Sequence, residues 1–197
     1  MTSSISPIHS SNTSPSFTSS EEQRLYSALE RLYGAQGAKQ IRSSHVMVIG
    51  IGGVGSWSAE ALARSGVGKI TLVDLDHISL SNINRQIHAV QSSLGQSKVL
   101  AMQERLWAIN PSLNVQIIDD FVSPENWLDL VPVDVDGVID ACDQLSAKLA
   151  MSVWARKNKK LFITVGAAGG NAAEPERQAG SQGAAQARGR AACVRGA

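Results

Sequence analysis

Short apolar runs recur through the middle of the chain, separated by stretches with a different periodicity. The runs are rich in Val, Ile and Leu and too short for ordinary helices, which is typical of buried strands. The predicted strands span residues 45–50, 69–74, 114–119, 137–140 and 161–165.

The stretches before and between these runs carry apolar residues three or four positions apart, which indicates helices. The predicted helices span residues 21–40, 53–64, 96–110 and 143–158. Gly34 and Gly37 break the pattern near the end of the first helix. On the last helix, we expect Leu145, Leu149 and Val153 to face the core.

Alternating strands and helices predict an α/β fold with a mainly parallel sheet. Right-handed crossovers would make it a doubly wound, Rossmann-like sheet of order 3-2-1-4-5, with helices on both faces and strand 161–165 at an edge. Ligands of such sheets bind beyond the carboxyl ends of the strands. The polar clusters of the sequence fall at these ends, so we expect the functional site there.

Composition divides the chain into three parts. Residues 1–20 are rich in Ser and Thr and hold no charged side chain, so we expect a disordered N-terminus. Residues 21–170 hold the predicted strands and helices and form the expected domain. Residues 171–197 are a low-complexity Ala/Gly/Arg segment, read either as a flexible tail or as out-of-frame translation of GC-rich DNA.

The overall composition excludes several classes of protein. A formal net charge of +1 gives no argument for nucleic acid or a membrane surface. The chain has no run of 18 apolar residues and no signal-peptide pattern. Its two cysteines, Cys142 and Cys193, lie in dissimilar contexts, which argues against a disulfide framework and fits a reducing, cytoplasmic compartment.

The first chemistry-bearing motif is a glycine loop between the first strand and the second helix. Gly50, Gly52 and Gly55 match G-x-G-x-x-G, and Gly53 lies within the loop. The pattern permits a tight turn, close approach of the backbone to phosphate, and close packing of helix on strand. Asp74 ends the second strand, where an acid binds ribose hydroxyls. The loop predicts a nucleotide and leaves NAD and ATP open.

A polar string after the second strand favours ATP over NAD. It contains Asn82, Arg85 and Gln86. A positioned guanidinium stabilises the charge that develops when an α-phosphate is attacked, so Arg85 is a candidate catalytic residue. Lys98 opens the next helix, where the helix dipole opposes a cation unless a phosphate is near; an exposed surface lysine is the alternative.

The fourth strand ends in an acidic turn. Asp143 is a candidate Mg²⁺ ligand, because a carboxylate facing a nucleotide commonly holds this ion through few protein contacts. Its alternative role is to cap the following helix. We interpret Cys142 as a small buried residue, His88 as structural, and Trp57 with the other tryptophans as packing groups rather than base-stacking ones.

Several segments together resemble the ThiF/MoeB group of ubiquitin-activating-type adenylyltransferases. Within that group, the likeness is strongest to the tRNA threonylcarbamoyladenosine dehydratases, and it runs from about residue 30 to residue 170. The segments that carry it are Arg31–Gly34, GIGGVGSW at 50–57, ARSGVGKITLVDLD at 63–76, SNINRQIHA at 81–89, GQSKV at 95–99, INP at 109–111 and VIDACD at 138–143.

The resemblance implies ATP-Mg²⁺ binding and adenylation of a carboxylate, here that of threonylcarbamoyladenosine beside the tRNA anticodon, followed by a cyclising dehydration. The glycine loop would hold phosphates, with Asn82, Arg85 and Lys98 at the triphosphate and Asp143 at the metal. The resemblance also implies a homodimer in which Arg31 reaches the ATP site of the neighbouring subunit.

Three other functions stay open on the sequence alone. One is adenylation of a ubiquitin-like sulfur-carrier protein. Another is an NAD-binding dehydrogenase, against which Lys98 and the polar string argue. The third is a non-enzymatic ATP-binding or dimerisation module.

The sequence departs from the family beyond Gly170. Members of the family continue with further strands and a catalytic-cysteine loop, whereas this chain has the Ala/Gly/Arg segment. We therefore expect a truncated or frameshifted chain with impaired activity, and Cys142 does not correspond to the family cysteine.

Overall fold

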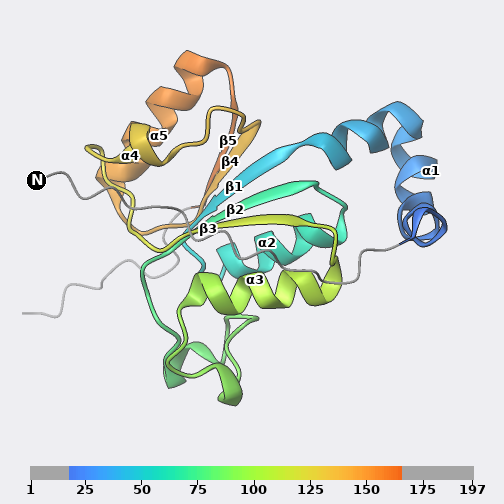
Figure 1. The fold of residues 1–197 in the computed structure, drawn as a ribbon. Helices are drawn as coiled ribbons and strands as arrows, with labels where there is room; N and C mark the ends of the chain where they lie inside the picture. Colours follow the sequence, from blue (N-terminus) through green and yellow to red (C-terminus); the bar gives the residue numbers. More distant parts are fainter. Residues whose placement is uncertain (1–17, 166–197) are drawn as a thin grey trace, which may run out of the picture. The chain divides into compact units, whose positions relative to one another are not determined.

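A computed structural model describes residues 18–165, and they form a single parallel sheet of order β3-β2-β1-β4-β5 with helices on both faces (Figure 1). This arrangement confirms the predicted fold class and strand order. Residues 1–17 of the predicted disordered N-terminus (1–20) lie outside the described residues, whereas residues 18–20 cap and begin a helix; the last residues of the predicted domain (166–170) and the whole 171–197 segment also lie outside them. The strands are β1 (His45–Ile49), β2 (Lys69–Val73), β3 (Asn114–Ile118), β4 (Gly137–Asp140) and β5 (Leu161–Thr164).

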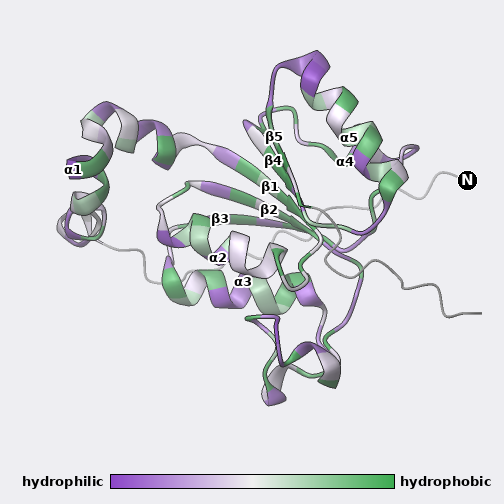
Figure 2. Ribbon diagram, turned by 180° about the vertical axis from the view of Figure 1, so that it is seen from behind, coloured by the Kyte–Doolittle hydropathy of each residue, from purple (hydrophilic) through white to green (hydrophobic). Residues whose placement is uncertain are grey.

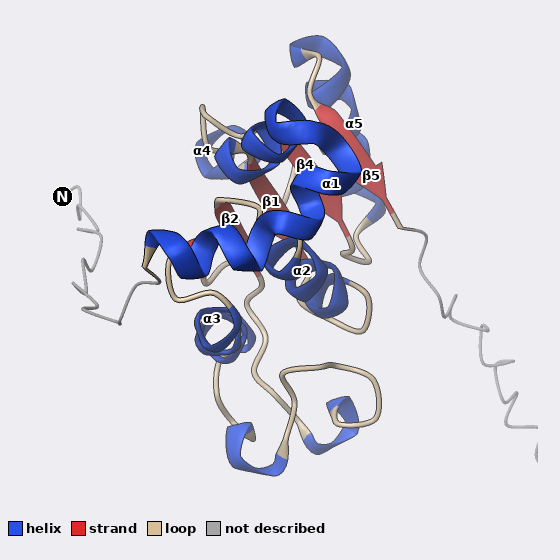
Figure 3. Cartoon of the chain, turned by 90° about the vertical axis from the view of Figure 1, so that its right-hand side faces the viewer, coloured by secondary structure: helices blue, strands red, loops and turns tan. Residues whose placement is uncertain are grey.

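Two helices cover each face of the sheet, as Figures 1 and 3 show. On one side lie α2 (Gly55–Arg64) and α3 (Lys98–Ile109), and on the other lie α4 (Trp127–Leu130) and α5 (Leu145–Asn158). The bounds of α2, α3 and α5 agree with the predicted ranges within two residues, whereas the sequence pattern did not predict α4. The long β2–α3 connection contains two short 3₁₀ turns, η1 (Leu80–Asn82) and η2 (Gln91–Ser93).

Alternation along the strands divides the core in two. In β1, Val46 and Val48 face α2 and α3, whereas Met47 and Ile49 face α4 and α5. The central strands β1, β2 and β4 are buried on both faces and need no polar alternation, so their runs are almost continuously apolar, and Figure 2 shows the hydrophobic colour along most of their length. The observed strand bounds agree with the predicted ranges within one residue.

Helix α5 corrects one prediction. Leu145, Leu149 and Val153 are 80%, 64% and 60% exposed instead of facing the core. The buried stripe consists of Ala147, Met151 and Ala155. Small side chains let α5 approach the sheet closely, and this stripe packs among Met47, Val138 and Trp127.

The sheet edge beside α5 is also apolar and exposed among residues 18–165. Strand β5 pairs only with β4 in this sheet, and Leu161 and Ile163 are exposed on it. The predicted edge position of this strand is confirmed.

Helix α1 (Ser19–Ser43) precedes the sheet and is kinked. It begins at Thr18, whose hydroxyl accepts from the Glu21 amide while the Glu21 carboxylate accepts from the Thr18 amide, a capping box. Gly34 has φ of +73° and breaks the helix, as its position predicts, but helical structure resumes beyond it (Figure 3). Within the described part of the chain, no helix is long and apolar enough to cross a membrane.

Candidate nucleotide-binding site

A cavity of about 550 Å³ lies beyond the carboxyl ends of β1, β2 and β4. Parallel strands deliver their following loops to this one edge, which is where the sequence predicts the site. The cavity is bordered by the glycine loop, the turn after β2, the start of α3, the segment after β3 and the acidic turn after β4. The predicted site residues that line it are Gly50, Gly52, Asp74, Lys98 and Asp143.

The glycine loop has steric reasons for its composition. Gly50 has φ of +82°, and a Cβ there would lie 2.8 Å from the Ala141 carbonyl oxygen. A Cβ on Gly55 would overlap the Gly50 carbonyl oxygen. Gly52 differs, because a Cβ on it would meet no described atom within 4 Å, and the residue borders the cavity. Gly50 and Gly55 therefore shape the loop, while Gly52 leaves its backbone open to a ligand.

Asp74 ties the end of β2 to the glycine loop. Its carboxylate accepts from the Ile51 amide at 2.6 Å and from the Asp76 amide at 2.8 Å. Burial raises the pKa of Asp74 above its usual value, although these two donors and Lys98 oppose that shift. Each carboxylate oxygen has a second acceptor position, so the group can still bind a hydroxyl.

Lys98 is buried at the cavity wall, so the alternative of an exposed helix lysine is wrong. Its Nζ lies 2.6 Å from Asp76 Oδ2 and 3.8 Å from Asp74 Oδ1. The cation at the N-terminus of α3 is thus stabilised by carboxylates that also border the cavity. A phosphate entering the cavity would compete with Asp76 for this charge.

The polar string on the β2–α3 connection separates into different roles. Asn82 is buried and accepts from the Ser79 amide at 2.9 Å, which caps η1. Gln86 is buried, and its Oε1 has no partner among residues 18–165. Arg85 lies beside the glycine loop, because a Cβ on Gly53 would be 3.5 Å from its Cδ. The cavity wall includes none of these three residues.

The acidic turn after β4 contains an ion pair that the sequence reasoning missed. Asp140 is fully buried and accepts from Lys148 Nζ at 2.9 Å, Thr164 Oγ1 at 2.7 Å and the Cys142 amide at 3.2 Å. Lys148 also donates to the Val165 carbonyl at 3.1 Å. The sequence feature that could have indicated this pair is Lys148 itself, because it directly follows Ala147, which is buried on α5.

Asp143 lines the cavity with an exposed side chain. The capping alternative is wrong, since Gln144 holds the cap position of α5 and makes no side-chain cap bond there. Residues 18–165 contain no group of three or more His, Cys, Asp or Glu side chains that could form a metal site by themselves. An ion at Asp143 would therefore need further ligands from a bound nucleotide or from water.

Two titratable groups nearby are held neutral. Burial and the adjacent Asp140 raise the pKa of Cys142 to about 11, so its thiol stays protonated at neutral pH. Burial, Lys98 and Arg105 lower the pKa of His88 to about 4. Neither ring nitrogen of His88 has a hydrogen-bond partner among the described residues.

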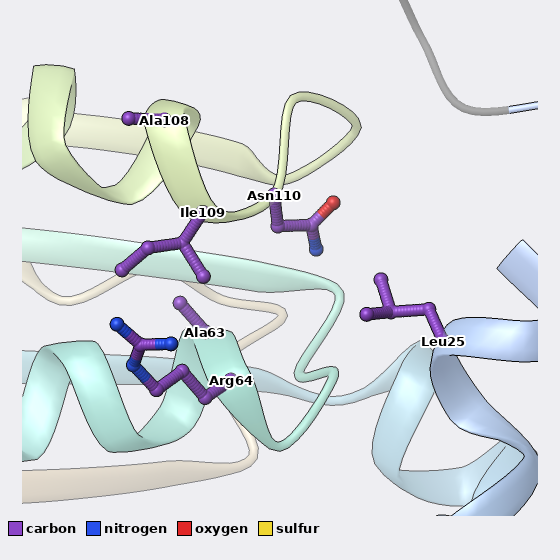
Figure 4. A pocket seen from close by; sticks show the side chains of 6 residues that line it. All are labelled: Leu25, Ala63, Arg64, Ala108, Ile109 and Asn110. Carbon is purple, nitrogen blue, oxygen red and sulfur yellow. The ribbon is translucent and has the colours of Figure 1, made fainter. Parts of the chain in front are cut away.

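A second cavity, of about 380 Å³, lies between α1 and the C-terminal ends of α2 and α3 (Figure 4). Leu25, Ala63 and Ile109 make its apolar part, and Arg64 beside them pairs with Glu60. Arg31, the candidate for contact across a dimer, lies exposed on α1 and borders neither cavity.

A parallel sheet of this order, with a glycine loop between its first strand and a helix, defines an α/β nucleotide-binding domain. The model of the ThiF family matches residues 24–184, which is more than half of the chain. The chain therefore belongs to the ThiF family, which confirms the resemblance that the motifs indicate.

Comparison with individual proteins shows which members of the ThiF family the chain resembles. The chain is 48% identical over 149 residues to the tRNA threonylcarbamoyladenosine dehydratase of Haemophilus influenzae, which covers 76% of this chain and 57% of that protein. The crystal structure of the Escherichia coli tRNA N6-threonylcarbamoyladenosine dehydratase in complex with ATP has a TM-score of 0.71 and 42% identity, covering 74% of this chain and 60% of that one. The sulfur carrier protein adenylyltransferase of Thermus thermophilus is 32% identical over 116 residues, 58% of this chain and 42% of that protein. The chain thus spans little more than half the length of its dehydratase relatives.

Proposed function

We propose that this chain is the ATP-binding part of a tRNA threonylcarbamoyladenosine dehydratase, which adenylates the threonine-derived carboxylate of the modified base and closes it into a ring. One observation carries the proposal. The cavity residues Gly52, Asp74 and Lys98 stand together in a chain that is 48% identical to such a dehydratase. The relation to a sulfur carrier protein adenylyltransferase is more distant, at 32% identity, and that activity is the alternative.

The residues around the cavity fit a nucleoside triphosphate. The open face of Gly52 gives phosphate oxygens room to approach backbone amides, and α2 begins just beyond the loop at Gly55. Lys98 supplies a cation that can exchange Asp76 for a phosphate. Asp74 would accept hydrogen bonds from the ribose hydroxyls.

The proposed reaction is nucleophilic attack by the substrate carboxylate on the α-phosphate. An oxygen–phosphorus bond forms to the carboxylate, the bond to pyrophosphate breaks, and an acyl adenylate results. Arg85 would stabilise the charge on the α-phosphate oxygens during this step. Ring closure onto the activated carbonyl then expels AMP.

Mg²⁺ is part of the proposal. Asp143 would hold it together with phosphate oxygens and water, which fits a cavity where the described residues supply few carboxylates of their own. The ion would neutralise negative charge on the triphosphate. We also propose a cytoplasmic homodimer in which Arg31 of one subunit serves the site of the other, with tRNA as substrate.

The decisive assay is ATP–pyrophosphate exchange with each acceptor. Exchange that requires threonylcarbamoyladenosine-modified tRNA supports the proposal, and exchange that requires a sulfur-carrier protein establishes the alternative. In a full-length, active version of the protein, Arg85→Ala should lower kcat by orders of magnitude with little change in ATP affinity. An effect confined to KM would instead place Arg85 in ground-state binding.

The dimer can be tested separately by mixing subunits. Arg31→Ala and Arg85→Ala proteins should each be inactive, and a mixed dimer should regain activity because one of its two sites keeps both arginines. Heterodimers without recovered activity would contradict the role of Arg31.

A further inference from the structure

Trp57 occupies an unusual position for a tryptophan. It lies in the first turn of α2 and is 55% exposed, so it is not a core residue but stands at the edge of the helix. Its indole Nε1 donates to the carbonyl oxygen of Arg85 at 3.0 Å. This bond joins the helix that follows the glycine loop to a segment 28 residues further along the chain.

The Arg85 side chain is held at two further points. Its stem passes Gly53, where a Cβ would lie 3.5 Å from both Cγ and Cδ. Its guanidinium Nη1 donates to the Ser81 carbonyl at 2.7 Å and to Asn84 Oδ1 at 3.0 Å. Both of these guanidinium hydrogen bonds reach the connection that carries Arg85, whereas the indole bond comes from the helix on the other side of the glycine loop.

We propose that Trp57 is a positioning residue for Arg85. Its indole N–H fixes the backbone at Arg85 relative to α2, and thereby sets where the arginine side chain crosses the glycine loop. The inference rests on the proposed function, because it gives Trp57 a part in the same adenylation step.

The physical reason lies in what each partner is attached to. Arg85 is in an exposed turn, and such segments move more than the helices that flank them. Helix α2 is anchored through buried residues such as Ala59 and Ala63. A hydrogen-bond donor on α2 therefore fixes the turn relative to a packed helix. Reaction rates are sensitive to displacements of about 1 Å in the groups that act on the substrate.

A conservative substitution isolates the hydrogen bond. Trp57→Phe keeps an aromatic ring and removes the N–H. Trp107→Phe is a matched control, because Trp107 Nε1 donates to the Leu113 carbonyl at 3.1 Å, at the far end of α3 from Lys98. Both variants lose one indole-to-carbonyl bond, but only one of those bonds involves Arg85.

The first readout is independent of activity. Backbone hydrogen exchange is followed by mass spectrometry on peptides that cover residues 81–87 in the full 197-residue protein. Trp57→Phe should speed exchange in this segment by about three- to tenfold, the effect of losing one net hydrogen bond, and Trp107→Phe should not. Equal exchange in both variants and the parent overturns the proposal.

The second readout is kinetic. In ATP–pyrophosphate exchange, Trp57→Phe should lower kcat by about three- to tenfold while the KM for ATP changes less than about twofold. The same substitution should add nothing when Arg85 is already alanine, because both changes act on one group. Full additivity, or loss through KM alone, contradicts the positioning role. If a full-length version of the protein shows no exchange with any acceptor, the proposed function fails, and hydrogen exchange in the 197-residue protein still decides the role of Trp57.

Discussion

Two lysine–carboxylate pairs lie at the same edge of the sheet, and their burial differs sharply. Lys98 pairs with Asp76, which is 73% exposed, at the wall of the large cavity. Lys148 pairs with Asp140, which has no exposed side-chain surface and is also bonded to Thr164. In both pairs, the acid follows or ends a strand and the lysine comes from the next helix.

The difference shows how one chemical pairing serves two purposes. Asp76 can return to water when another anion takes its lysine, so Lys98 is free to change partners. Asp140 has no such alternative, because a buried carboxylate without its cation is strongly destabilising. We therefore propose that the Lys98 pair takes part in ligand binding and that the Lys148 pair supports the acidic turn.

The largest expected effect comes from breaking the buried Lys148–Asp140 pair. Lys148→Met should lower the free energy of unfolding by about 3–5 kcal/mol, because Asp140 stays buried without a cation. Urea denaturation measures this change. Lys157→Met is the control, an exposed lysine on the same helix, where the change should stay within about 0.5 kcal/mol. Similar changes in the free energy of unfolding for the two variants would show that the Lys148–Asp140 pair does not stabilise the fold.

The next effect concerns the Lys98–Asp76 pair at the cavity wall. Lys98→Met should weaken ATP binding by about 10- to 100-fold, the equivalent of one hydrogen bond to a charged group, and should cost less stability than Lys148→Met. Lys69→Met removes a lysine that pairs with Asp134 at 2.8 Å, at the opposite end of β2, and serves as the control. Unchanged ATP affinity in the Lys98 variant would remove this residue from the site.

A smaller effect should appear in the pH dependence of stability. His88 has a folded-state pKa of about 4, below its ordinary value near 6.5, so the unfolded chain binds the proton more readily. Stability should therefore fall as pH decreases through this window, by about 1 kcal/mol per pH unit at most from this one group.

His88→Leu isolates that contribution. The variant should lose less stability than the parent between pH 6.5 and 4.5, and the remaining slope includes His45, whose pKa burial and Lys69 also lower. Replacing the exposed His77 with Gln is the control. Parallel stability curves for the parent and the His88→Leu protein would contradict a neutral buried imidazole.

The last expected change concerns the chemical reactivity of a thiol. Because the pKa of Cys142 is raised to about 11, its thiolate is scarce at pH 7.5, and alkylation by iodoacetamide should be about 100-fold slower than for the same peptide in urea. Peptide mass spectrometry measures both rates in one protein. Rapid labelling in the native state would show an activated thiol next to the cavity.

The sequence predicts the parts of this molecule whose causes are local. The glycine loop is one such part, because the positive φ of Gly50 and the close approach of Gly55 to the Gly50 carbonyl both arise within the loop itself. The central strands β1, β2 and β4 are another, because burial on both faces leaves a nearly continuous apolar run. The roles of residues in the polar string were harder to predict, because Asn82 caps η1 by accepting a hydrogen bond from the Ser79 amide.

Features that depend on tertiary packing could not be read in this way. Helix α5 has two stripes at the same spacing, and pattern alone favours the larger side chains of Leu145 and Leu149 over Ala147 and Met151. Only the distance between helix and sheet decides between them. The partner of Lys148 is likewise set by how α5 lies on β4.

The most direct test of the central claim is calorimetric titration of the 197-residue protein with ATP and with NAD, in the presence of Mg²⁺. The account predicts tighter binding of ATP, and loss of that binding in Gly52→Asp, whose carboxylate would project into the space left open at this loop. Tighter binding of NAD, or ATP binding that Gly52→Asp leaves unchanged, would contradict a triphosphate site at the carboxyl edge of the sheet.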